Sequence, residues 1–273
     1  MDEARMRSRR ARADGGIAAG STLCEYLRLN MDAFRIEPHA HTSAVSPCGR
    51  LTPAELVGAY REAGYACLVV TDHFVSSLPI FRGIRRWIDR VDAYFDGYRR
   101  ARKAAEGTGL TVLPGLEVTL DSLPGVDLLV YGADEQAVAD TPDLYALAPE
   151  DFRSWAREAG ALIFQAHPFR GAGPADLALL DGVEIFNGNA RHDSRNDLAA
   201  EFARRHSLLE IGGSDAHQPE DVARSGIATT ARPESVPDLV ALLRRSPGSV
   251  SVLTSAAERK KAGRPTAARR EEG

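Results

Sequence analysis

The sequence is poor in cysteine and lysine, and it contains no long hydrophobic run. Its three cysteines, Cys24, Cys48 and Cys67, form no C-x-x-C pair, which argues against a disulfide framework and a structural zinc ribbon. No apolar stretch approaches the roughly 18 residues of a membrane span. The arginine-rich first twenty residues lack the apolar core of a secretory signal. We therefore expect a cytoplasmic protein that does not enter a membrane.

Nearly all of the positive charge is arginine, because only Lys103, Lys260 and Lys261 occur among 34 basic residues. The formal net charge of −4 is uneven: residues 1–14 carry +2 and residues 256–273 carry +3, which leaves −9 on the 241 residues between them. Nucleic acid binds mainly through neutralisation of its phosphates by clustered basic side chains. Such an acidic central region favours a small substrate over a nucleic-acid chain.

Apolar runs typical of strands alternate with helical patterns, which indicates βα units around a parallel sheet. The predicted strands are Phe34–Pro38, Cys67–Thr71, Leu110–Val118, Val126–Tyr131, Leu162–Ala166, Gly182–Phe186, Leu208–Gly212, Gly226–Thr229 and Ser249–Leu253. The predicted helices run from the Thr52 cap to near Gly64, over about 83–106, and over Pro149–Glu158, Asp193–His206 and Pro237–Arg244. We expect one domain at 34–255, between a partly disordered arm (1–33) and a basic disordered tail (256–273).

Histidines and acidic residues recur at the ends of the predicted strands. His39 and His41 are alternate residues, so in a strand they leave the same face and can hold one metal ion. The full set is His39, His41, Asp72, His73, Glu117, His167, Asp215 and His217. Sites in parallel α/β folds lie at the carboxyl ends of strands, and this set is hard to assign to packing. We interpret the other two histidines, His192 and His206, as surface or capping residues.

These residues lie in motifs that resemble, in the same order, those of the PHP (polymerase and histidinol phosphatase) domain. The motifs are His39-Ala40-His41-Thr42, Thr71-Asp72-His73, Gly115-Leu116-Glu117, Ala166-His167-Pro168 and Gly213-Ser214-Asp215-Ala216-His217. The resemblance implies a distorted (β/α)7 barrel with a two- or three-metal centre that hydrolyses phosphoesters. The metal ligands that it implies are His39, His41, His73, Glu117, His167, Asp215 and His217. Asp72 matches the motif, and we expect it to orient His73 or to hold the strand end.

The sequence departs from the PHP pattern at two positions. The family usually has a further His or Asp a few residues after the first motif, where this chain has Ser43-Ala44-Val45-Ser46-Pro47-Cys48-Gly49. Cys48 could replace that ligand, but Pro-Cys-Gly is equally a plain turn, so we expect two tightly held ions and a weak or absent third. Family members often have a histidine at the start of the strand Val126–Tyr131, where Asp127 could coordinate or could serve a structural turn.

The ligand types suggest a mechanism. Imidazole with carboxylate suits Zn, Mn or Fe rather than Mg or Ca, and two such ions activate water, so that hydrolysis needs no protein nucleophile. The sequence has no Gly-x-Ser-x-Gly that would supply one. Arginine forks suit a phosphate. Arg170, which closely follows His167, and Arg191 or Arg195, which follow the strand Gly182–Phe186, are placed to bind it.

The predicted function is a phosphatase for small phosphomonoesters, and three alternatives stay open. An amidohydrolase also begins with H-x-H, but its two-metal members bridge the ions with a modified lysine, and the only lysine before residue 260 is Lys103, on a predicted helix. A PHP-type nuclease acting on DNA or RNA ends shares the metal centre but should have a basic groove. The third alternative is a PHP module that binds metal without catalysis.

Overall fold

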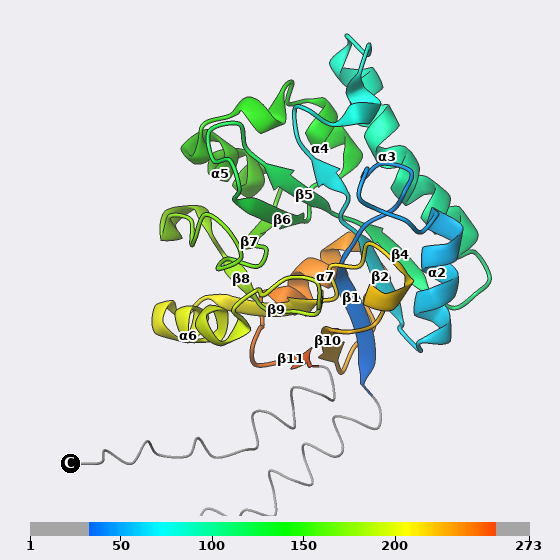
Figure 1. The fold of residues 1–273 in the computed structure, drawn as a ribbon, viewed down its shortest axis with the longest axis vertical. Coiled ribbons are helices and arrows are strands. Elements are labelled where there is room, and N and C mark those ends of the chain that lie inside the picture. Colours follow the sequence, from blue (N-terminus) through cyan, green and yellow to red (C-terminus); the bar gives the residue numbers. More distant parts are fainter. Residues whose placement is uncertain (1–32, 255–273) are drawn as a thin grey trace, which may run out of the picture. The chain divides into compact units, whose positions relative to one another are not determined.

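The computed structural model describes residues 33–254. The arm predicted at 1–33, except Ala33, and the tail predicted at 256–273 lie outside the described residues. Residues 33–254 belong to one of the two units into which the chain divides, Ala33–Gly273, and they form a mixed α/β fold (Figure 1). Among them, no helix is long and apolar enough to cross a membrane.

The strands of the described region form two hydrogen-bonded sheets, with the orders β11-β10-β1-β2-β4 and β3-β5-β6-β7-β8-β9. They are β1 (Phe34–Ala40), β2 (Cys67–Val70), β3 (His73–Phe74), β4 (Thr111–Pro114), β5 (Leu116–Thr119), β6 (Asp127–Tyr131), β7 (Leu162–Gln165), β8 (Gly182–Asn187), β9 (Leu209–Gly213), β10 (Gly226–Thr229) and β11 (Val250–Leu253). Strands β1, β2 and β4 are parallel, and so are β7, β8 and β9. The β1–β10, β10–β11, β5–β6 and β6–β7 pairs are antiparallel, so both sheets are mixed rather than wholly parallel.

The structure does not confirm a closed (β/α)7 barrel, because the described strands pair as two sheets. The sheets meet where β1 lies beside β9, through an isolated bridge between Ala40 and Ala216. Glu37 of β1 reinforces this contact, since its Oε1 accepts a hydrogen bond of 3.0 Å from the backbone N–H of Ser214. The ends of β1 and β9 are therefore held together without a continuous ladder.

The predicted strand Leu110–Val118 is two strands instead of one. β4 pairs with β2, whereas β5 pairs with β3 and β6 in the other sheet. The chain crosses between the sheets at Gly115, where a Cβ would come within 2.8 Å of Thr71 Cγ2, so that a larger residue would not fit. This crossing places Glu117 opposite His73 in the register of β3 and β5.

Six helices of four residues or more flank the sheets in the described region: α2 (Pro53–Glu62), α3 (Trp87–Ala104), α4 (Glu135–Ala139), α5 (Pro149–Glu158), α6 (Asn196–His206) and α7 (Val236–Leu243). Thr52 and Glu55 form the predicted capping box of α2. Two helices begin later than predicted. α3 begins after Arg86, whose backbone is extended (φ −80°, ψ 134°), and α6 begins after Arg195, whose φ is +48°; neither conformation is helical.

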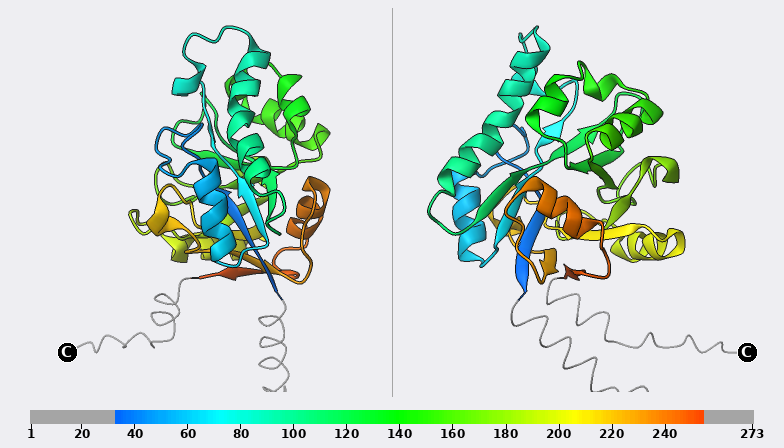
Figure 2. Two further views of the ribbon diagram at one scale, coloured as in Figure 1. Left: turned by 90° about the vertical axis from the view of Figure 1, so that its right-hand side faces the viewer. Right: turned by 180° about the vertical axis from the view of Figure 1, so that it is seen from behind.

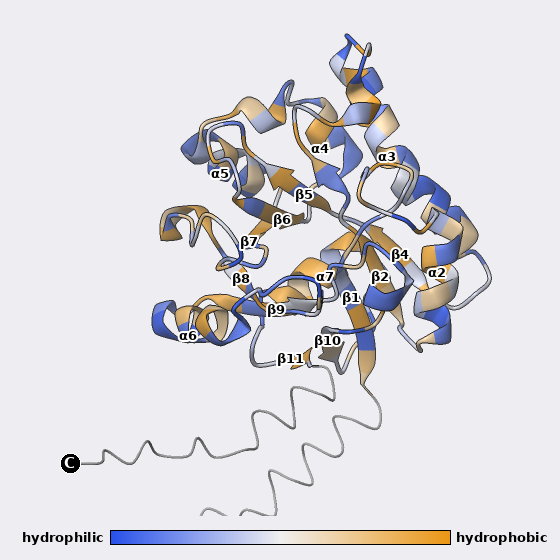
Figure 3. Ribbon diagram, viewed as in Figure 1, coloured by the Kyte–Doolittle hydropathy of each residue, from blue (hydrophilic) through white to orange (hydrophobic). Residues whose placement is uncertain are grey.

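Apolar side chains of the strands and of α7 fill the space between the two sheets. Ile36, Leu129, Phe164 and Ile211 are almost fully buried there with Leu239 of α7. α7 (orange) lies against the strands on the side that faces the viewer in the right-hand view of Figure 2. Figure 3 shows hydrophobic strands in the middle and hydrophilic outer surfaces on α2, α3 and α6. This packing fixes the strands whose ends carry the polar residues.

Candidate metal centre

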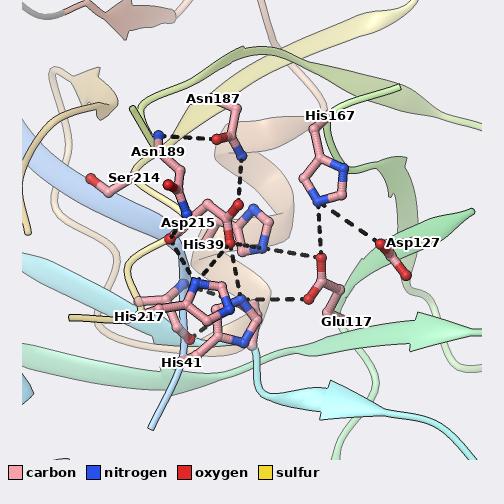
Figure 4. A network of polar contacts seen from close by, with 12 residues as sticks. His39, His41, Glu117, Asp127, His167, Asn187, Asn189, Ser214, Asp215 and His217 are labelled. Atoms are coloured by element: carbon pink, nitrogen blue, oxygen red, sulfur yellow. Dashed lines mark hydrogen bonds and ion pairs between the residues drawn. The ribbon is translucent and has the colours of Figure 1, made fainter. Parts of the chain in front are cut away.

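The seven predicted metal ligands come together where β1, β3, β5, β7 and β9 converge. Figure 4 labels all of them except His73. Potential ligand atoms form four groups of three residues, and within each group the three atoms lie within 4.8 Å of one another. The groups are His39, His41 and Glu117; His39, His167 and Asp215; Glu117, Asp127 and His167; and His41, His73 and His217. His39, His41 and Glu117 are fully buried. The groups share members, as expected of a centre with more than one ion.

Glu117 lies among the histidines, and each of its oxygens contacts two of them. Oε1 is 3.2 Å from His39 Nε2 and 3.5 Å from His167 Nε2. Oε2 is 2.7 Å from His73 Nδ1 and 3.5 Å from His41 Nε2. A tetrahedral ion with metal–ligand bonds of about 2.0–2.2 Å separates its ligand atoms by roughly 3.3–3.6 Å. Three of the four distances are at or near this separation, so Glu117 and these histidines have the spacing of metal ligands.

Several buried polar atoms of the cluster have no hydrogen-bond partner. They are His39 Nε2, His41 Nε2 and both carboxylate oxygens of Glu117. Asp215 Oδ1 also lies 3.4 Å from His39 Nε2 and 3.3 Å from His41 Nε2, again at the spacing of ligands around one ion. Buried polar atoms are almost always satisfied. These residues therefore fit divalent metal, whose binding would satisfy these atoms.

The charge state of the two carboxylates and of His41 suits metal binding. Burial alone would raise the pKa of Glu117, but the neighbouring His73 ring holds that pKa well below its usual value. The pKa of Asp215 is lowered against its burial too, chiefly by His39. Burial keeps the pKa of His41 well below its usual value. Ionised carboxylates and neutral imidazoles are the forms that coordinate metal. Burial lowers the pKa of His39 and of His73, but Glu184 and Glu117, respectively, hold these pKa values well above the usual value, so metal would displace a proton from each ring.

Two residues of the cluster have an unusual backbone conformation. His167 has φ of +31° and Asp215 has φ of +50°, in the left-handed region that residues other than glycine rarely adopt. Such strain persists only where the surroundings fix it, and it gathers at functional sites. At His167, the backbone N–H donates a hydrogen bond of 3.0 Å to Glu184 Oε2.

Glu184 is a fully buried residue of the site that was not predicted from the sequence. Its Oε1 lies 3.0 Å from His39 Nδ1, and its Oε2 accepts hydrogen bonds from His167 N and from Asn187 Nδ2, at 3.0 and 2.9 Å. A carboxylate on one nitrogen of a histidine fixes the ring so that the other nitrogen can bind metal. The available signal was an acidic residue inside the otherwise apolar stretch Gly182–Phe186, because a buried charge requires partners.

Glu37 is a second buried carboxylate that was not predicted. Its Oε1 accepts hydrogen bonds from the backbone N–H groups of His39 and Ser214, at 2.9 and 3.0 Å, and its Oε2 accepts one of 2.8 Å from the Tyr60 hydroxyl. Burial raises the pKa of Glu37 to about 7, although these hydrogen bonds lower it. Glu37 thus fixes the strand ends that carry His39 and Asp215.

Asp72 holds the turn that follows β1. Its carboxylate accepts three hydrogen bonds of 2.7 Å, from Thr42 N, Thr42 Oγ1 and Ser46 Oγ. Ser46 Oγ in turn accepts a hydrogen bond of 3.0 Å from His73 N and lies 3.4 Å from His41 Nδ1. These contacts describe a positioning residue, in line with the expectation that Asp72 holds the strand end.

Comparison with known proteins points to one family. The family model described as PHP-associated matches residues 193–246. The fold is similar to that of a two-domain protein from Bacteroides vulgatus that contains a predicted PHP-like metal-dependent phosphoesterase, with a TM-score of 0.61 and 20% identity. One segment thus matches a PHP-associated model, and the fold resembles that of a protein with a predicted PHP-like phosphoesterase. The similarity covers 82% of this chain but only 65% of the Bacteroides chain, which is therefore the longer protein.

Other solved structures have a similar fold. PsfC from Pseudomonas syringae has a TM-score of 0.57 at 16% identity, over 85% of this chain and 96% of PsfC. The lesion-specific endonuclease Q from Pyrococcus furiosus has a TM-score of 0.52 at 15% identity, over 81% of this chain and 57% of the endonuclease. No curated protein matches the sequence significantly. At these identities, the similarity concerns the fold.

Both departures from the PHP motifs lie at the cluster. Asp127 Oδ1 accepts a hydrogen bond of 2.6 Å from Thr119 Oγ1, while its Oδ2 lies 4.0 Å from His167 Nε2. One oxygen thus has a structural partner and the other faces the cluster. Cys48 is exposed, and its thiol lies against the rings of His73 and His217. Burial raises the pKa of this thiol, but hydrogen bonds with His217 and His73 lower it to about 6.

An open cavity of about 580 Å³ leads to the cluster of predicted metal ligands. Arg170 lines this cavity and is fixed on three sides: its guanidinium donates hydrogen bonds to Asp215 Oδ2 at 2.8 Å, to Asn187 Oδ1 at 2.7 Å and to Ser194 Oγ at 2.9 Å. Arg170 thereby contacts a predicted metal ligand. In this position Arg170 can orient Asp215, and it can also bind an anion in the cavity.

Arg191 also lines the cavity, and its Nη2 lies 3.0 Å from Asp221 Oδ2. Arg195, its alternative in the sequence prediction, pairs with Asp197 at 3.6 Å and does not line this cavity. His192 is exposed, as expected, but it too lines the cavity. The structure thus brings Arg170 and Arg191 to the site and leaves Arg195 outside it.

Proposed function

We propose that the protein is a metal-dependent phosphoesterase that hydrolyses small phosphomonoesters. The observation that carries this proposal is the group of buried atoms without hydrogen-bond partners on His39, His41 and Glu117. Their neighbour Asp215 lines an open cavity. The PHP-type fold supports it, since the similar Bacteroides protein contains a predicted metal-dependent phosphoesterase.

The residues suit two ions of the Zn, Mn or Fe type. His39, His41, Glu117 and Asp215 would hold one ion, and Glu117, Asp127 and His167 would hold a second, with Glu117 shared between them. Bound there, the ions would lower the pKa of a water molecule and neutralise charge on the phosphate oxygens. The mixed imidazole and carboxylate set favours these metals over Mg and Ca.

The chain itself contributes orientation and charge. Glu184 keeps His39 Nε2 directed at Glu117 and Asp215, since it occupies the other ring nitrogen. Arg170 is held in one orientation by Asp215 and by neutral partners, and it presents positive charge to the cavity. Guanidinium groups bind phosphate oxygens with directed hydrogen bonds. Arg191 adds a second positive charge on the same cavity.

The substrate that we propose is small. The cavity of about 580 Å³ is of the size that holds a metabolite or a drug-sized ligand. The central part of the chain carries −9, whereas a long polyanion needs clustered basic side chains. A nuclease is the second candidate, because endonuclease Q has a similar fold. A module without catalysis is the third.

Two arginine variants test the role of the cavity. The protein is stripped of metal, reloaded with Mn²⁺ or Zn²⁺, and assayed with a panel of phosphomonoesters, phosphodiesters and single-stranded DNA. Arg191→Ala should raise KM for the best phosphomonoester about tenfold, which corresponds to about 1.4 kcal/mol of lost binding. Arg195→Ala, four residues away and outside the cavity, is the matched control and should leave KM unchanged.

Three results would count against the proposal. Preference for DNA over every phosphomonoester would favour the nuclease. The absence of turnover with any metal would favour the module without catalysis. An equal rise of KM in both variants would show that Arg191 acts through net charge and not as part of a binding site.

A further inference from the structure

We propose that Cys48 is a metal ligand, and that it forms a sulfur-containing position with His73 and His217 that selects zinc over manganese. This inference rests on the proposed metal centre and concerns a third position in it. In the PHP pattern that the sequence resembles, a His or Asp follows the first motif, and here the corresponding segment offers a thiol. The donor atom at this position thereby changes from nitrogen or oxygen to the softer sulfur.

The first observation is the location of the thiol. Cys48 lines the cavity together with His73 and His217, and its thiol lies close to both rings. These rings come from different elements: His73 begins β3, and His217 follows β9. A chance surface cysteine would not be expected to contact two imidazoles from separate strands.

The second observation is that the segment carrying Cys48 has a fixed path. Arg50 N donates a hydrogen bond to His217 O, and Gly49 N donates one of 3.0 Å to Ser46 O. Gly49 packs so closely that a Cβ would lie 2.7 Å from the carbonyl carbon and oxygen of Thr42. Backbone bonds and close packing therefore hold Cys48 against the rings, which a plain surface turn would not require.

The third observation is independent of the cysteine. His41, His73 and His217 offer nitrogens that lie within 4.8 Å of one another. Their rings are stacked, with centroids 4.2 Å apart for His41 and His217 and 4.5 Å apart for His41 and His73. His41 is fully buried, and its Nε2 has no hydrogen-bond partner. This nitrogen lies 3.5 Å from Glu117 Oε2 and 3.3 Å from Asp215 Oδ1 and so belongs to the centre described above. The stacked rings of His73 and His217 extend that centre toward the thiol.

The donor set determines which cation suits the position. A thiolate with two or three imidazoles is typical of zinc, with bonds of about 2.3 Å to sulfur and 2.0–2.1 Å to nitrogen. Manganese prefers oxygen donors, which the opposite side of the centre provides through Glu117, Asp127 and Asp215. We therefore assign the softer ion to the Cys48 side and the harder one to the carboxylate side.

Cobalt substitution tests the assignment directly, because a thiolate bound to Co²⁺ has a strong charge-transfer absorption in the near ultraviolet that nitrogen and oxygen ligands lack. The full-length protein is loaded with Co²⁺ as wild type, as Cys48→Ser and as Cys67→Ala. Cys67, buried in β2 away from the cluster, is the matched control. Wild type and Cys67→Ala should show the band, and Cys48→Ser should lack it while retaining the weaker cobalt bands of the remaining site.

Two further readouts complete the test. Elemental analysis should find about one zinc ion fewer per chain in Cys48→Ser than in wild type. Saturating zinc should slow alkylation of Cys48 by iodoacetamide at least tenfold, while manganese should not. A wild-type protein that binds cobalt without the sulfur band, or a Cys48→Ser variant that keeps it, would overturn the inference but leave the proposed metal centre intact. A protein that binds no metal would overturn both.

Discussion

Replacing Glu184 by glutamine should weaken metal binding without removing a metal ligand. In the Glu184 carboxylate, Oε1 lies 3.0 Å from His39 Nδ1, while Oε2 accepts hydrogen bonds from His167 N and Asn187 Nδ2. Glutamine has only one oxygen. If that oxygen faces His39, the amide NH₂ faces the donors His167 N and Asn187 Nδ2, which then lose their acceptor. If it faces those donors, the NH₂ faces His39 Nδ1, and the ring proton must move to Nε2, the atom that is needed for metal.

The magnitude follows from these contacts. Leaving a buried donor without a partner costs about 1–3 kcal/mol. Loss of the group that orients a metal-binding histidine typically lowers metal affinity about 10- to 100-fold, which equals roughly 1.4–2.7 kcal/mol. We therefore expect Glu184→Gln to bind Zn²⁺ or Mn²⁺ about 10- to 100-fold more weakly than wild type. Phosphatase activity should recover in part at saturating metal, because every predicted ligand is still present.

Competition against a chromophoric chelator measures this affinity. Glu62→Gln makes the same chemical change at an exposed position at the end of α2 and should leave the affinity unchanged. Circular dichroism of each variant controls for folding. A metal affinity of Glu184→Gln within twofold of wild type would refute the argument that the Glu184 carboxylate orients His39.

Two further predictions concern the turn after β1 and the ends of the chain. Asp72→Ala removes the acceptor of three hydrogen bonds from Thr42 and Ser46, so urea unfolding of the metal-free protein should show a loss of roughly 2–4 kcal/mol; an unchanged midpoint would contradict this. Deletion of residues 1–20 and 257–273, which removes mainly basic charge, should barely change phosphomonoester turnover or its weak dependence on salt. Processive degradation of single-stranded DNA that disappears with those residues would instead support the nuclease.

The convergence of the seven predicted ligands could be anticipated because each motif stands at the end of an apolar run. Strand ends meet in α/β folds, so His39 and Asp215 could be expected together although they are far apart in the sequence. The exact partition into sheets could not be anticipated. Leu110–Val118 reads as a single apolar strand, and the crossing at Gly115 depends on how closely Thr71 approaches it.

The supporting carboxylates could not be identified from the sequence for a different reason. Glu37 and Glu184 lie within apolar strands, where an isolated acidic residue is equally consistent with an exposed face. Their partners, such as Ser214 for Glu37 and His39 for Glu184, become neighbours only through tertiary pairing. Similarly, Arg191 and Arg195 were equivalent in the sequence, and only the path of the chain before α6 distinguishes them.

The turnover of the best phosphomonoester by the His39→Ala/His41→Ala variant, measured after reloading with metal, tests the central claim most directly. Both side chains are fully buried and belong to the proposed metal centre. The account predicts a fall of at least about 1000-fold, equal to roughly 4 kcal/mol of lost transition-state stabilisation, with a circular dichroism spectrum like that of wild type. Hydrolysis at the wild-type rate by this folded variant would contradict the account.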